Sequence, residues 1–248
     1  MIYHHLLGCA GRKEISQCTP SRSPMSNLVV KELTPSLRDD FLLFFDNIAF
    51  TDNPEWSDCY CSLYHFANKG KAESRRQASS LIEEDRMHGF LAYDSGKPVG
   101  WCNAAPRGSY PALHWLMSPG PDKAERVGSI VCFVVASSHR SQGVASRLLD
   151  AACQKFSREG LGFAEAYPVK KPASAAWDFP GPLSMYLKNG FSTHRDADWY
   201  LVVRKRLETQ AEPHRPFLAE VSSVAGPVAF AVTSWILTRK KGWGFTWC

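Results

Sequence analysis

The apolar residues of the chain include one stretch that is apolar at nearly every position. This stretch, residues 129–136, contains Ile130-Val131-Cys132-Phe133-Val134-Val135, and such a run is typical of a central strand that is buried on both faces. Residues 144–159 follow with apolar positions on one side of a helical repeat, and Gly160 ends the pattern. The sequence therefore predicts a strand, a turn over residues 137–143 and a helix.

The rest of the pattern predicts further strands and helices on either side of this unit. Short β patterns bounded by turn residues predict strands, and apolar positions spaced by three to four residues predict helices. The predicted strands are residues 27–33, 89–94, 97–101, 162–169, 191–193 and 199–203, and the predicted helices begin at Thr34-Pro35 and cover residues 72–84 and 182–189. This order predicts an α+β or α/β domain in three layers.

The two ends of the chain differ from this pattern. Residues 1–26 are rich in Ser, Pro and other polar residues and predict a flexible N-terminal extension. Residues 208–248 form a C-terminal extension in which residues 217–237 are apolar apart from Glu220 and a few hydroxyl residues. A membrane anchor needs about 20 apolar residues, and Glu220 and a Gly-Pro pair interrupt this stretch. A packed or poorly ordered extension is therefore favoured over a membrane anchor, and the folded domain is predicted to span residues 27–207.

Composition and charge are those of a globular protein in a reducing compartment. The chain has 248 residues, of which 44% are hydrophobic and 21% charged, enough for one large domain or two small ones. The net charge of +5 is spread along the chain without a long basic run, which argues against nucleic acid as a partner. The eight cysteines are irregularly spaced, and Cys132 and Cys153 fall in apolar patterns as buried free thiols. The N-terminus lacks the features of a signal peptide, so we expect a cytoplasmic protein.

The turn between the central strand and its helix has the residue types of an anion-binding site. Its core is Arg140-Ser141-Gln142-Gly143-Val144-Ala145. The first turn of a helix leaves backbone N–H groups without partners, and these donors and the helix dipole attract an anion. Gly143 has no Cβ and Ala145 is nearly as small, so phosphate oxygens can approach the main chain. We interpret this segment as a pyrophosphate-binding turn.

The same segment follows the pattern Arg/Gln-x-x-Gly-x-Gly/Ala, and it resembles the acetyl-coenzyme A motif of the GNAT acyltransferase superfamily. The resemblance covers about residues 27–207 and includes Tyr186, which stands four residues before Gly190-Phe191. Residues 52–61 and 100–107 are similar to one GNAT subgroup. The resemblance implies a three-layer fold with a central mixed, mostly antiparallel sheet and helices on both faces, and it implies an acetyl-CoA-dependent N-acyltransferase.

The resemblance also implies roles for individual residues. The central strand would pair with the pantetheine arm, and a backbone N–H of Val134 or Val135 would stabilise the charge that develops on the carbonyl oxygen. Tyr186 would protonate the departing thiolate, for which a phenol is a suitable donor. Acetyl-CoA is the implied cosubstrate and a small-molecule or peptide amine the acceptor, without a metal; a homodimer is left open. The implied cofactor-binding residues are Phe133, Val134, Val135, Arg140, Ser141, Gln142, Gly143, Val144, Ala145 and Ser146.

The sequence departs from the family pattern at two positions. Many members carry a Glu near the start of the central strand, where this chain has Gly128-Ser129-Ile130, and many have an Asn where this chain has Phe179. The general base therefore stays open, with Glu165, Asp178, a water chain and an amine that arrives neutral as candidates. The missing carboxylate also motivates an alternative function, an inactive domain that binds coenzyme A as a sensor or interaction module.

An aromatic-rich loop precedes the second predicted helix, in a region that shapes the acceptor pocket in GNAT-like folds. The resemblance therefore makes Trp56, Tyr60 and Arg107 candidates for acceptor binding, with structural packing as the alternative for the aromatic residues. Cys59-x-Cys61 followed by a histidine could suggest zinc. Structural zinc sites use pairs separated by two to four residues together with a second pair, and neither feature is evident here. We therefore expect no metal.

Overall fold

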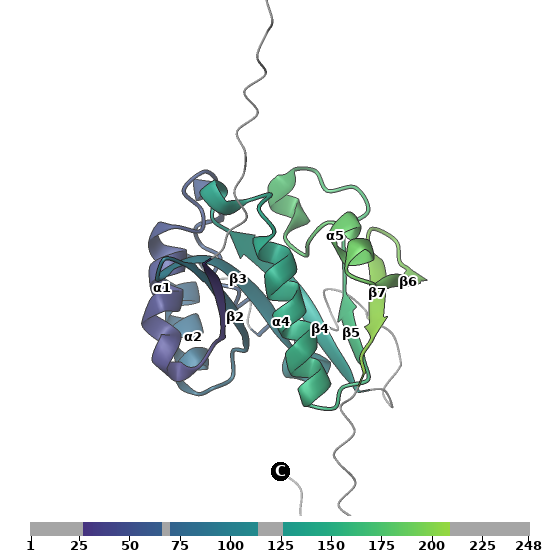
Figure 1. Ribbon diagram of the computed structural model, residues 1–248. Helices are drawn as coiled ribbons and strands as arrows, with labels where there is room; N and C mark the ends of the chain where they lie inside the picture. The colour runs from purple at the N-terminus through teal and green to yellow at the C-terminus, as the bar shows by residue number, and fades with distance from the viewer. Residues whose placement is uncertain (1–26, 66–69, 114–125, 209–248) are drawn as a thin grey trace, which may run out of the picture. The chain divides into compact units, whose positions relative to one another are not determined.

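The computed structural model describes residues 27–65, 70–113 and 126–208 (Figure 1). In this part of the chain seven strands form one sheet in the order β1-β2-β3-β4-β5-β7-β6, and all neighbours are antiparallel except β4 and β5. The strands are β1 (Leu28–Glu32), β2 (Gly89–Asp94), β3 (Lys97–Pro106), β4 (Val127–Val135), β5 (Phe163–Ala166), β6 (Ser192–Asp196) and β7 (Leu201–Arg206). The α-helices are α1 (Arg38–Asn47), α2 (Lys71–Glu83), α4 (Val144–Arg158) and α5 (Leu183–Lys188). The predicted mixed α/β fold with a mostly antiparallel sheet is confirmed.

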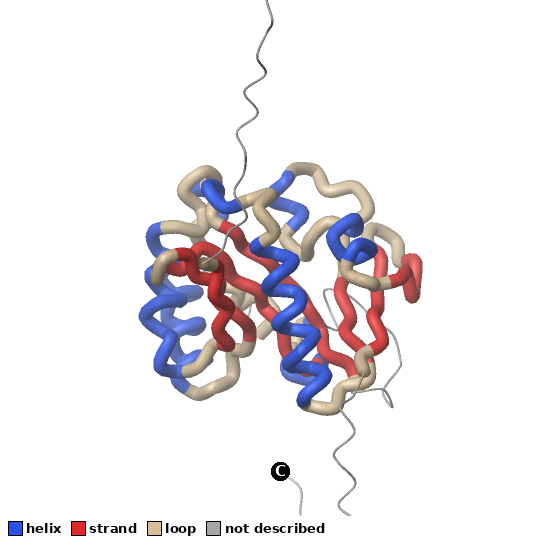
Figure 2. The backbone as a smooth tube through the Cα atoms, in the orientation of Figure 1, coloured by secondary structure: helices blue, strands red, loops and turns tan. Residues whose placement is uncertain are grey.

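Helices α1 and α4 cover opposite faces of the sheet (Figure 2). Neighbouring residues of a strand point to opposite faces, and two neighbours on β3 separate the two layers. Trp101 packs edge-on against Phe41 of α1, with ring centroids 4.9 Å apart. A Cβ on Gly100 would come within 2.9 Å of Val144 of α4. The absence of a side chain at Gly100 therefore allows α4 to approach the sheet at the point where that helix begins.

The central strand β4 is paired on both sides only along its first half. β5 pairs with residues Val127–Ile130 alone, whereas β3 pairs with β4 from Gly128 to Val135. The pairing with β3 passes from Ile130 opposite Ala104 to Cys132 opposite Asn103, which leaves Val131 as a bulge. Beyond Ile130, the edge of β4 that faces away from β3 is open to the segment that follows β5. This divergence of β4 and β5 creates the space in which the candidate site lies.

The predicted strands and helices agree with the observed ones in type and order, but several boundaries differ. β6 and β7 end at Asp196 and Arg206, each three residues later than predicted. β3 continues to Pro106 rather than ending near Trp101, because its second half pairs with β4. The first helix begins with a 3-10 turn over Pro35–Leu37 before α1 starts. β5 ends at Ala166, although Val169 still forms an isolated bridge.

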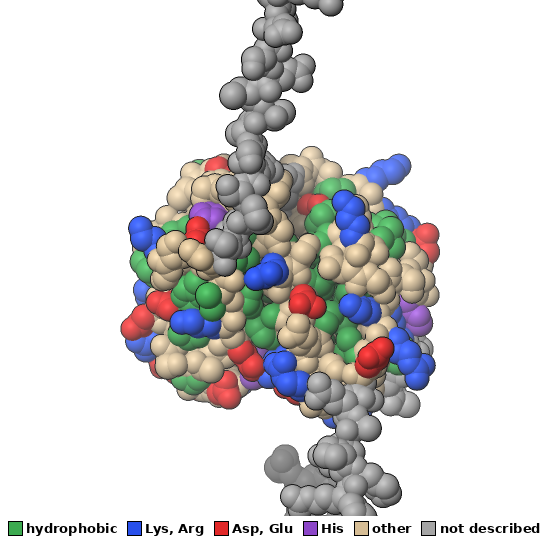
Figure 3. All heavy atoms as spheres, in the orientation of Figure 1, with side chains coloured by type: hydrophobic (Ala, Val, Ile, Leu, Met, Phe, Trp, Pro, Cys, Tyr) green, Lys and Arg blue, Asp and Glu red, His purple; other side chains and the backbone are tan. Residues whose placement is uncertain are grey.

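The predictions for residues 1–26 and for most of the C-terminal extension lie outside the described residues. Within the described part, no helix combines the length and apolar character that a membrane span requires. Figure 3 shows Lys and Arg side chains interspersed with Asp and Glu on the visible face, which carries α4. The charges on this face are thus mixed, as the spread of charged residues along the sequence predicts.

Candidate active site

The turn that leads into α4 has a backbone suited to an anion. Gly143 is the N-cap residue of α4 with φ of +86°, and Ser141 also lies in the left-handed region, with φ of +59°. The first backbone bond inside the helix runs from the Arg147 N–H to the Gly143 carbonyl at 3.0 Å. The N–H groups of residues 144–146 therefore precede the helical ladder. A Cβ on Gly143 would meet no atom within 4 Å, so there is open space at this turn, which fits a pyrophosphate group.

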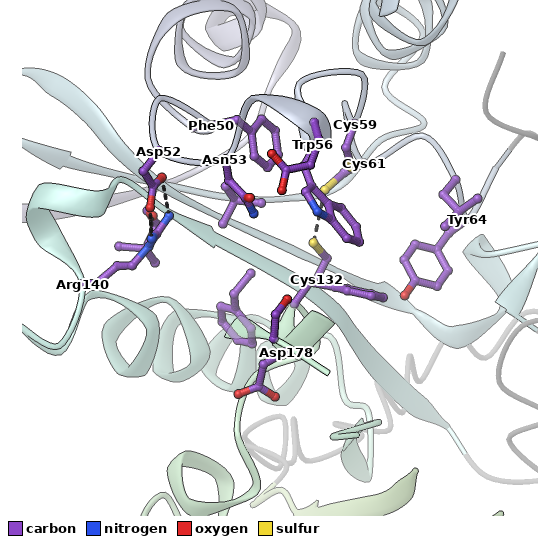
Figure 4. Close-up of a pocket in the computed structure, with 18 residues that line it drawn as sticks. Phe50, Asp52, Asn53, Trp56, Cys59, Cys61, Tyr64, Cys132, Arg140 and Asp178 are labelled. Atoms are coloured by element: carbon purple, nitrogen blue, oxygen red, sulfur yellow. Dashed lines mark hydrogen bonds and ion pairs between the residues drawn. The ribbon is translucent and has the colours of Figure 1, made fainter. Parts of the chain in front are cut away.

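Arg140 connects this turn to the loop after α1. Its guanidinium donates to the two carboxylate oxygens of Asp52 at 2.5 and 3.0 Å, and its Nε donates to the Val135 carbonyl at 3.0 Å (Figure 4). The hydrogen bonds from Arg140 lower the pKa of Asp52, so this carboxylate stays ionised at neutral pH. Gln142 Nε2 donates to the Ser138 carbonyl at 2.7 Å. Arg140 and Gln142 of the predicted motif are thereby held by neighbouring backbone or side-chain groups.

A pocket of about 450 Å³ lies beside the second half of β4. This volume is typical of small-molecule sites. Its walls are the loop after α1, the edge of β4 that faces away from β3, and the segment before α5 (Figure 4). Among the predicted cofactor-binding residues, the pocket is lined by Phe133, Val134, Val135 and Arg140.

The hydrogen-bonding direction of β4 alternates along this wall. The Ala136 N–H donates to the Val99 carbonyl at 2.9 Å, and in an antiparallel ladder every second residue bonds to the same neighbour. The Val134 N–H therefore points toward Trp101 on β3, and those of Phe133 and Val135 point to the open edge. Of the two residues predicted to stabilise a carbonyl oxygen, only Val135 directs its N–H away from β3.

The segment before α5 already bonds to two groups that the family resemblance assigns to the cofactor. The Phe133 N–H donates to the Phe179 carbonyl at 2.7 Å, and the Tyr186 hydroxyl donates to the Pro180 carbonyl. Tyr186 is fully buried, and its burial raises its pKa well above the ordinary value, so the hydroxyl keeps its proton. The Phe179 carbonyl thus accepts the hydrogen bond of the strand edge, and the Pro180 carbonyl accepts that of the predicted proton donor.

Three cysteines, Cys59, Cys61 and Cys132, line the pocket close to one another (Figure 4). Cys61 Sγ donates to Cys132 Sγ at 3.4 Å. Hydrogen bonds within this group, together with burial, raise the pKa of Cys59 and Cys61 well above the usual thiol value. Protonated thiols are poor nucleophiles. In the described ranges, no group of three or more His, Cys, Asp or Glu side chains is arranged to hold a metal ion.

Trp56 and Tyr60 are close in sequence, but the fold separates them. Trp56 ends a short 3-10 turn and lines the pocket, where it packs against Trp177 with ring centroids 5.4 Å apart. Tyr60 is fully buried; its ring lies 5.7 Å from that of Phe45, and its hydroxyl donates to Asp46 at 2.5 Å. The structure therefore brings Trp56 to the pocket and places Tyr60 in the core against α1.

Glu165 and Arg107 are joined in an ion-pair network away from the pocket. The fully buried carboxylate of Glu165 accepts from Arg204 Nε at 2.5 Å and from the Tyr167 hydroxyl at 2.7 Å, and it lies 3.4 Å from Arg107 Nη1. Its oxygens are thus already bonded to neighbouring side chains. Neither Glu165 nor Arg107 lines the pocket, and the geometry gives Glu165 a part in joining β5 to β7.

Asp178 is a carboxylate of the pocket wall, at the end of a 3-10 turn (Ala175–Asp178). Partial burial raises its pKa above the usual aspartate value. Figure 4 shows its carboxylate pointing away from Cys61 and Cys132. The neighbouring Phe179 carbonyl is the one that holds the Phe133 N–H, so the orientation of Asp178 depends on the same short segment.

The comparison of the sequence with protein families matches residues 48–180 to the acetyltransferase (GNAT) family, which is more than half of the chain. The chain belongs to the GNAT acetyltransferase family. Members of this family are acetyl-CoA-dependent acyltransferases, so acyl transfer in general is the chemistry of this GNAT domain. No match is found among curated proteins.

A solved structure of a GNAT protein shares the fold. A GNAT-family acetyltransferase from Listeria monocytogenes 4b F2365 superposes with a TM-score of 0.50 at 12% identity, over 73% of this chain and 95% of that chain. The PaiA N-acetyltransferase from Thermoplasma acidophilum, solved in complex with coenzyme A, gives a TM-score of 0.47 at 10% identity, over 73% of this chain and 99% of that chain. At such identities the likeness concerns the fold.

Several contacts in and near the pocket of this GNAT domain are not predicted by the sequence. The start of β4 carries Ser129, whose hydroxyl is 2.8 Å from that of Tyr167, in place of the Glu of many GNAT relatives. In the sequence Asp52 is only one residue of an aromatic-rich loop, and no local signal indicates its ion pair, because its partner Arg140 is 88 residues away. The contact between Cys61 and Cys132 likewise joins distant segments, and no local sequence signal indicates it.

Proposed function

We propose that this chain is an N-acetyltransferase that moves an acetyl group from acetyl-CoA to a primary amine by direct attack. The observation that carries the proposal is the pocket, which runs along the edge of β4 that faces away from β3, as far as Arg140 next to the turn that begins α4. A thioester whose pantetheine arm lies on this edge would place its phosphates at the turn and its acetyl group among the pocket's aromatic and acidic residues.

Cofactor binding rests on main-chain groups. The N–H groups at the start of α4 hold the pyrophosphate, because they lack helical partners and the helix dipole favours an anion. The Phe133 N–H holds the pantetheine arm once it is released from the Phe179 carbonyl. Movement of the Phe179 backbone carbonyl also moves the neighbouring Pro180 carbonyl, which frees the Tyr186 hydroxyl, while the Phe179 ring stays in the pocket wall. Binding thus exchanges two internal hydrogen bonds for two to the cofactor.

The chemical step needs a proton acceptor, a charge stabiliser and a proton donor. The amine nitrogen bonds to the acetyl carbon, and the Val135 N–H stabilises the charge on the carbonyl oxygen. Asp178 takes one proton from the ammonium form of the amine, which frees the nitrogen lone pair for the attack, and the second N–H proton leaves to water as the amide forms; the raised pKa of Asp178 makes it a better base than an ordinary aspartate. The carbon–sulfur bond then breaks, and Tyr186 gives its proton to the thiolate. We prefer Asp178 to Glu165, because Glu165 is held by Arg204 and lies outside the pocket.

One observation favours a second candidate, an inactive domain that binds coenzyme A. The edge of β4 and the Tyr186 hydroxyl are both bonded to the segment before α5. If this segment stays in place, coenzyme A can still bind through the turn, but its thioester cannot reach the pocket. We give this candidate second place, because the pocket is large enough for a small molecule.

Thiol release from acetyl-CoA in the presence of a panel of amines separates the two candidates. The enzyme forms one free thiol per N-acetylated product, as counted by a thiol reagent and mass spectrometry. Saturable binding of acetyl-CoA without product from any amine supports the inactive domain instead. We propose the cytoplasm as the location of the protein, since the five described cysteines are free thiols.

A further inference from the structure

The pocket beside β4 combines aromatic walls with carboxylates. Aromatic side chains provide most of the contact area in ligand pockets, and a few polar groups fix the orientation of the ligand. The aromatic residues include Phe50, Trp56 and Phe179, and the carboxylates belong to Asp52, Glu55 and Asp178. Such a lining is suited to a ligand with a flat apolar body and a positive charge.

The positive charge within the pocket wall is already in use. Arg140 is the single Lys or Arg among the described residues that line the pocket. Both of its terminal nitrogens donate to Asp52, and its Nε donates to the Val135 carbonyl. Glu55 and Asp178 therefore carry negative charge that no cation of the lining balances. A ligand carboxylate in this pocket meets repulsion, and an ammonium group meets attraction.

Trp56 is held in position to contact the body of a ligand. Its ring lies at 90° to that of Trp177, at 5.4 Å, and at 43° to that of Phe179, at 6.5 Å. A Trp side chain has only two χ angles, so it provides contact area at a low conformational-entropy cost. The face of a Trp also attracts a cation within about 6 Å. Trp56 can thus contact either the apolar body or the amine of the acceptor.

We infer that the acceptor is a primary amine on an aromatic or similarly flat apolar body, without a carboxylate next to the amine. This inference rests on the proposed acetyl transfer, whose acceptor it specifies. It separates arylalkylamines from amino acids, which carry a carboxylate, and from polyamines, which lack an apolar body.

Three ligands that differ in one group test the charge rule, which is the expectation that a carboxylate next to the amine weakens the use of an acceptor. Tryptamine, tryptophan and tryptophan amide share the indole and the amine, and only tryptophan carries a carboxylate. We expect kcat/KM for tryptamine and for tryptophan amide to exceed that for tryptophan by about tenfold or more, since one unfavourable contact between unit charges reaches this size. Equal or better use of tryptophan overturns the inference. Use of spermidine at ten times the efficiency of tryptamine overturns the apolar-body part.

Two variants connect the preference to its residues. Glu55→Gln removes one carboxylate and should lower the ratio of kcat/KM for tryptamine to kcat/KM for tryptophan. Glu84→Gln should leave this ratio unchanged, because Glu84 is exposed and pairs with Arg86 outside the pocket. Trp56→Leu should raise KM for tryptamine about tenfold or more without changing the KM for acetyl-CoA. Trp199→Leu is the matched control, because Trp199 is exposed and packs against Tyr200. An unchanged ratio in Glu55→Gln contradicts the charge rule.

Binding measurements keep this inference distinct from the proposed reaction. The three indole ligands are titrated by calorimetry into the full chain saturated with coenzyme A, so that no acetyl transfer takes place. Tighter binding of tryptamine and tryptophan amide than of tryptophan supports the acceptor class even if turnover is absent. Turnover of other amines together with equal binding of the three ligands refutes the acceptor class and leaves acetyl transfer intact.

Discussion

Replacing Gly143 by alanine should weaken cofactor binding far more than it weakens the fold. Gly143 has φ of +86°, and a Cβ there would meet no protein atom within 4 Å. The cost to the free protein is therefore the left-handed backbone alone, about 1–2 kcal/mol, partly offset by the lower entropy of the unfolded alanine chain. A loss of about 1 kcal/mol lowers the Tm of a chain of this size by roughly 2–4 °C.

The effect on binding is larger, because the new methyl group stands where a phosphate oxygen would approach the main chain. Loss of one charge-assisted hydrogen bond costs about 1.5–3 kcal/mol, which raises Kd for acetyl-CoA about 10- to 150-fold. Gly96→Ala is the matched control. Gly96 has φ of +79°, a Cβ there would likewise meet no atom within 4 Å, and the residue lies in the turn between β2 and β3.

Calorimetric titration with acetyl-CoA and a thermal melt of each variant are the two assays. The expected result is a similar small drop in Tm for both variants and a loss of affinity in Gly143→Ala alone. Equal affinity of the two variants for acetyl-CoA refutes the placement of the pyrophosphate at this turn.

Three further outcomes are expected. Asp178→Asn should lower kcat about 100-fold or more and remove the loss of rate on acidification through its raised pKa; a nearly unchanged pH–rate profile points instead to a neutral amine. Tyr186→Phe should lower kcat by a similar factor while Kd for acetyl-CoA changes less than about twofold, and equal kcat argues against its role as proton donor. Burial lowers the pKa of His65 to about 4. The unfolded chain therefore binds the extra proton between about pH 6.5 and 4. The free energy of unfolding should therefore fall as the pH is lowered from about 6.5 to 4. Urea melts of His65→Gln should show a smaller decrease over the same range.

The sequence predicted the strand, the turn and the helix around Gly143 because each has a local cause. An apolar run fixes β4, a glycine without a side chain permits the turn, and a one-sided apolar repeat fixes α4. The position of Trp56 in the pocket also agrees with the sequence-based proposal for the acceptor site, although its role stays a prediction.

The parts of the site that the sequence did not predict depend on contacts between distant segments. Local pattern gives no reason to expect Trp56 in the pocket and Tyr60 in the core. The difference arises because the Tyr60 hydroxyl donates a hydrogen bond to Asp46 of α1. The bulge at Val131 and the short pairing of β5 decide which N–H groups of β4 face the pocket. The residue types alone allow Glu165 as a base, and its contact with Arg204, 39 residues later, arises only from the pairing of β5 with β7.

Another feature beyond the reach of local pattern is the segment before α5. Its carbonyls at Phe179 and Pro180 bond to the Phe133 N–H and to the Tyr186 hydroxyl. These bonds depend on how far β4 and β5 diverge, which is a property of the whole sheet. They link cofactor binding to a change in this segment, which also carries Asp178.

The central claim, acetyl transfer from acetyl-CoA to an amine, is tested most directly by following both products of one reaction. The full chain is incubated with acetyl-CoA and tryptamine, and the free thiol and the N-acetylated amine are counted together. Our account predicts that both products form in equal amounts, at a rate that depends on the amine and falls in Tyr186→Phe. Binding of acetyl-CoA without any N-acetylated product, across aryl, alkyl and peptide amines, contradicts it.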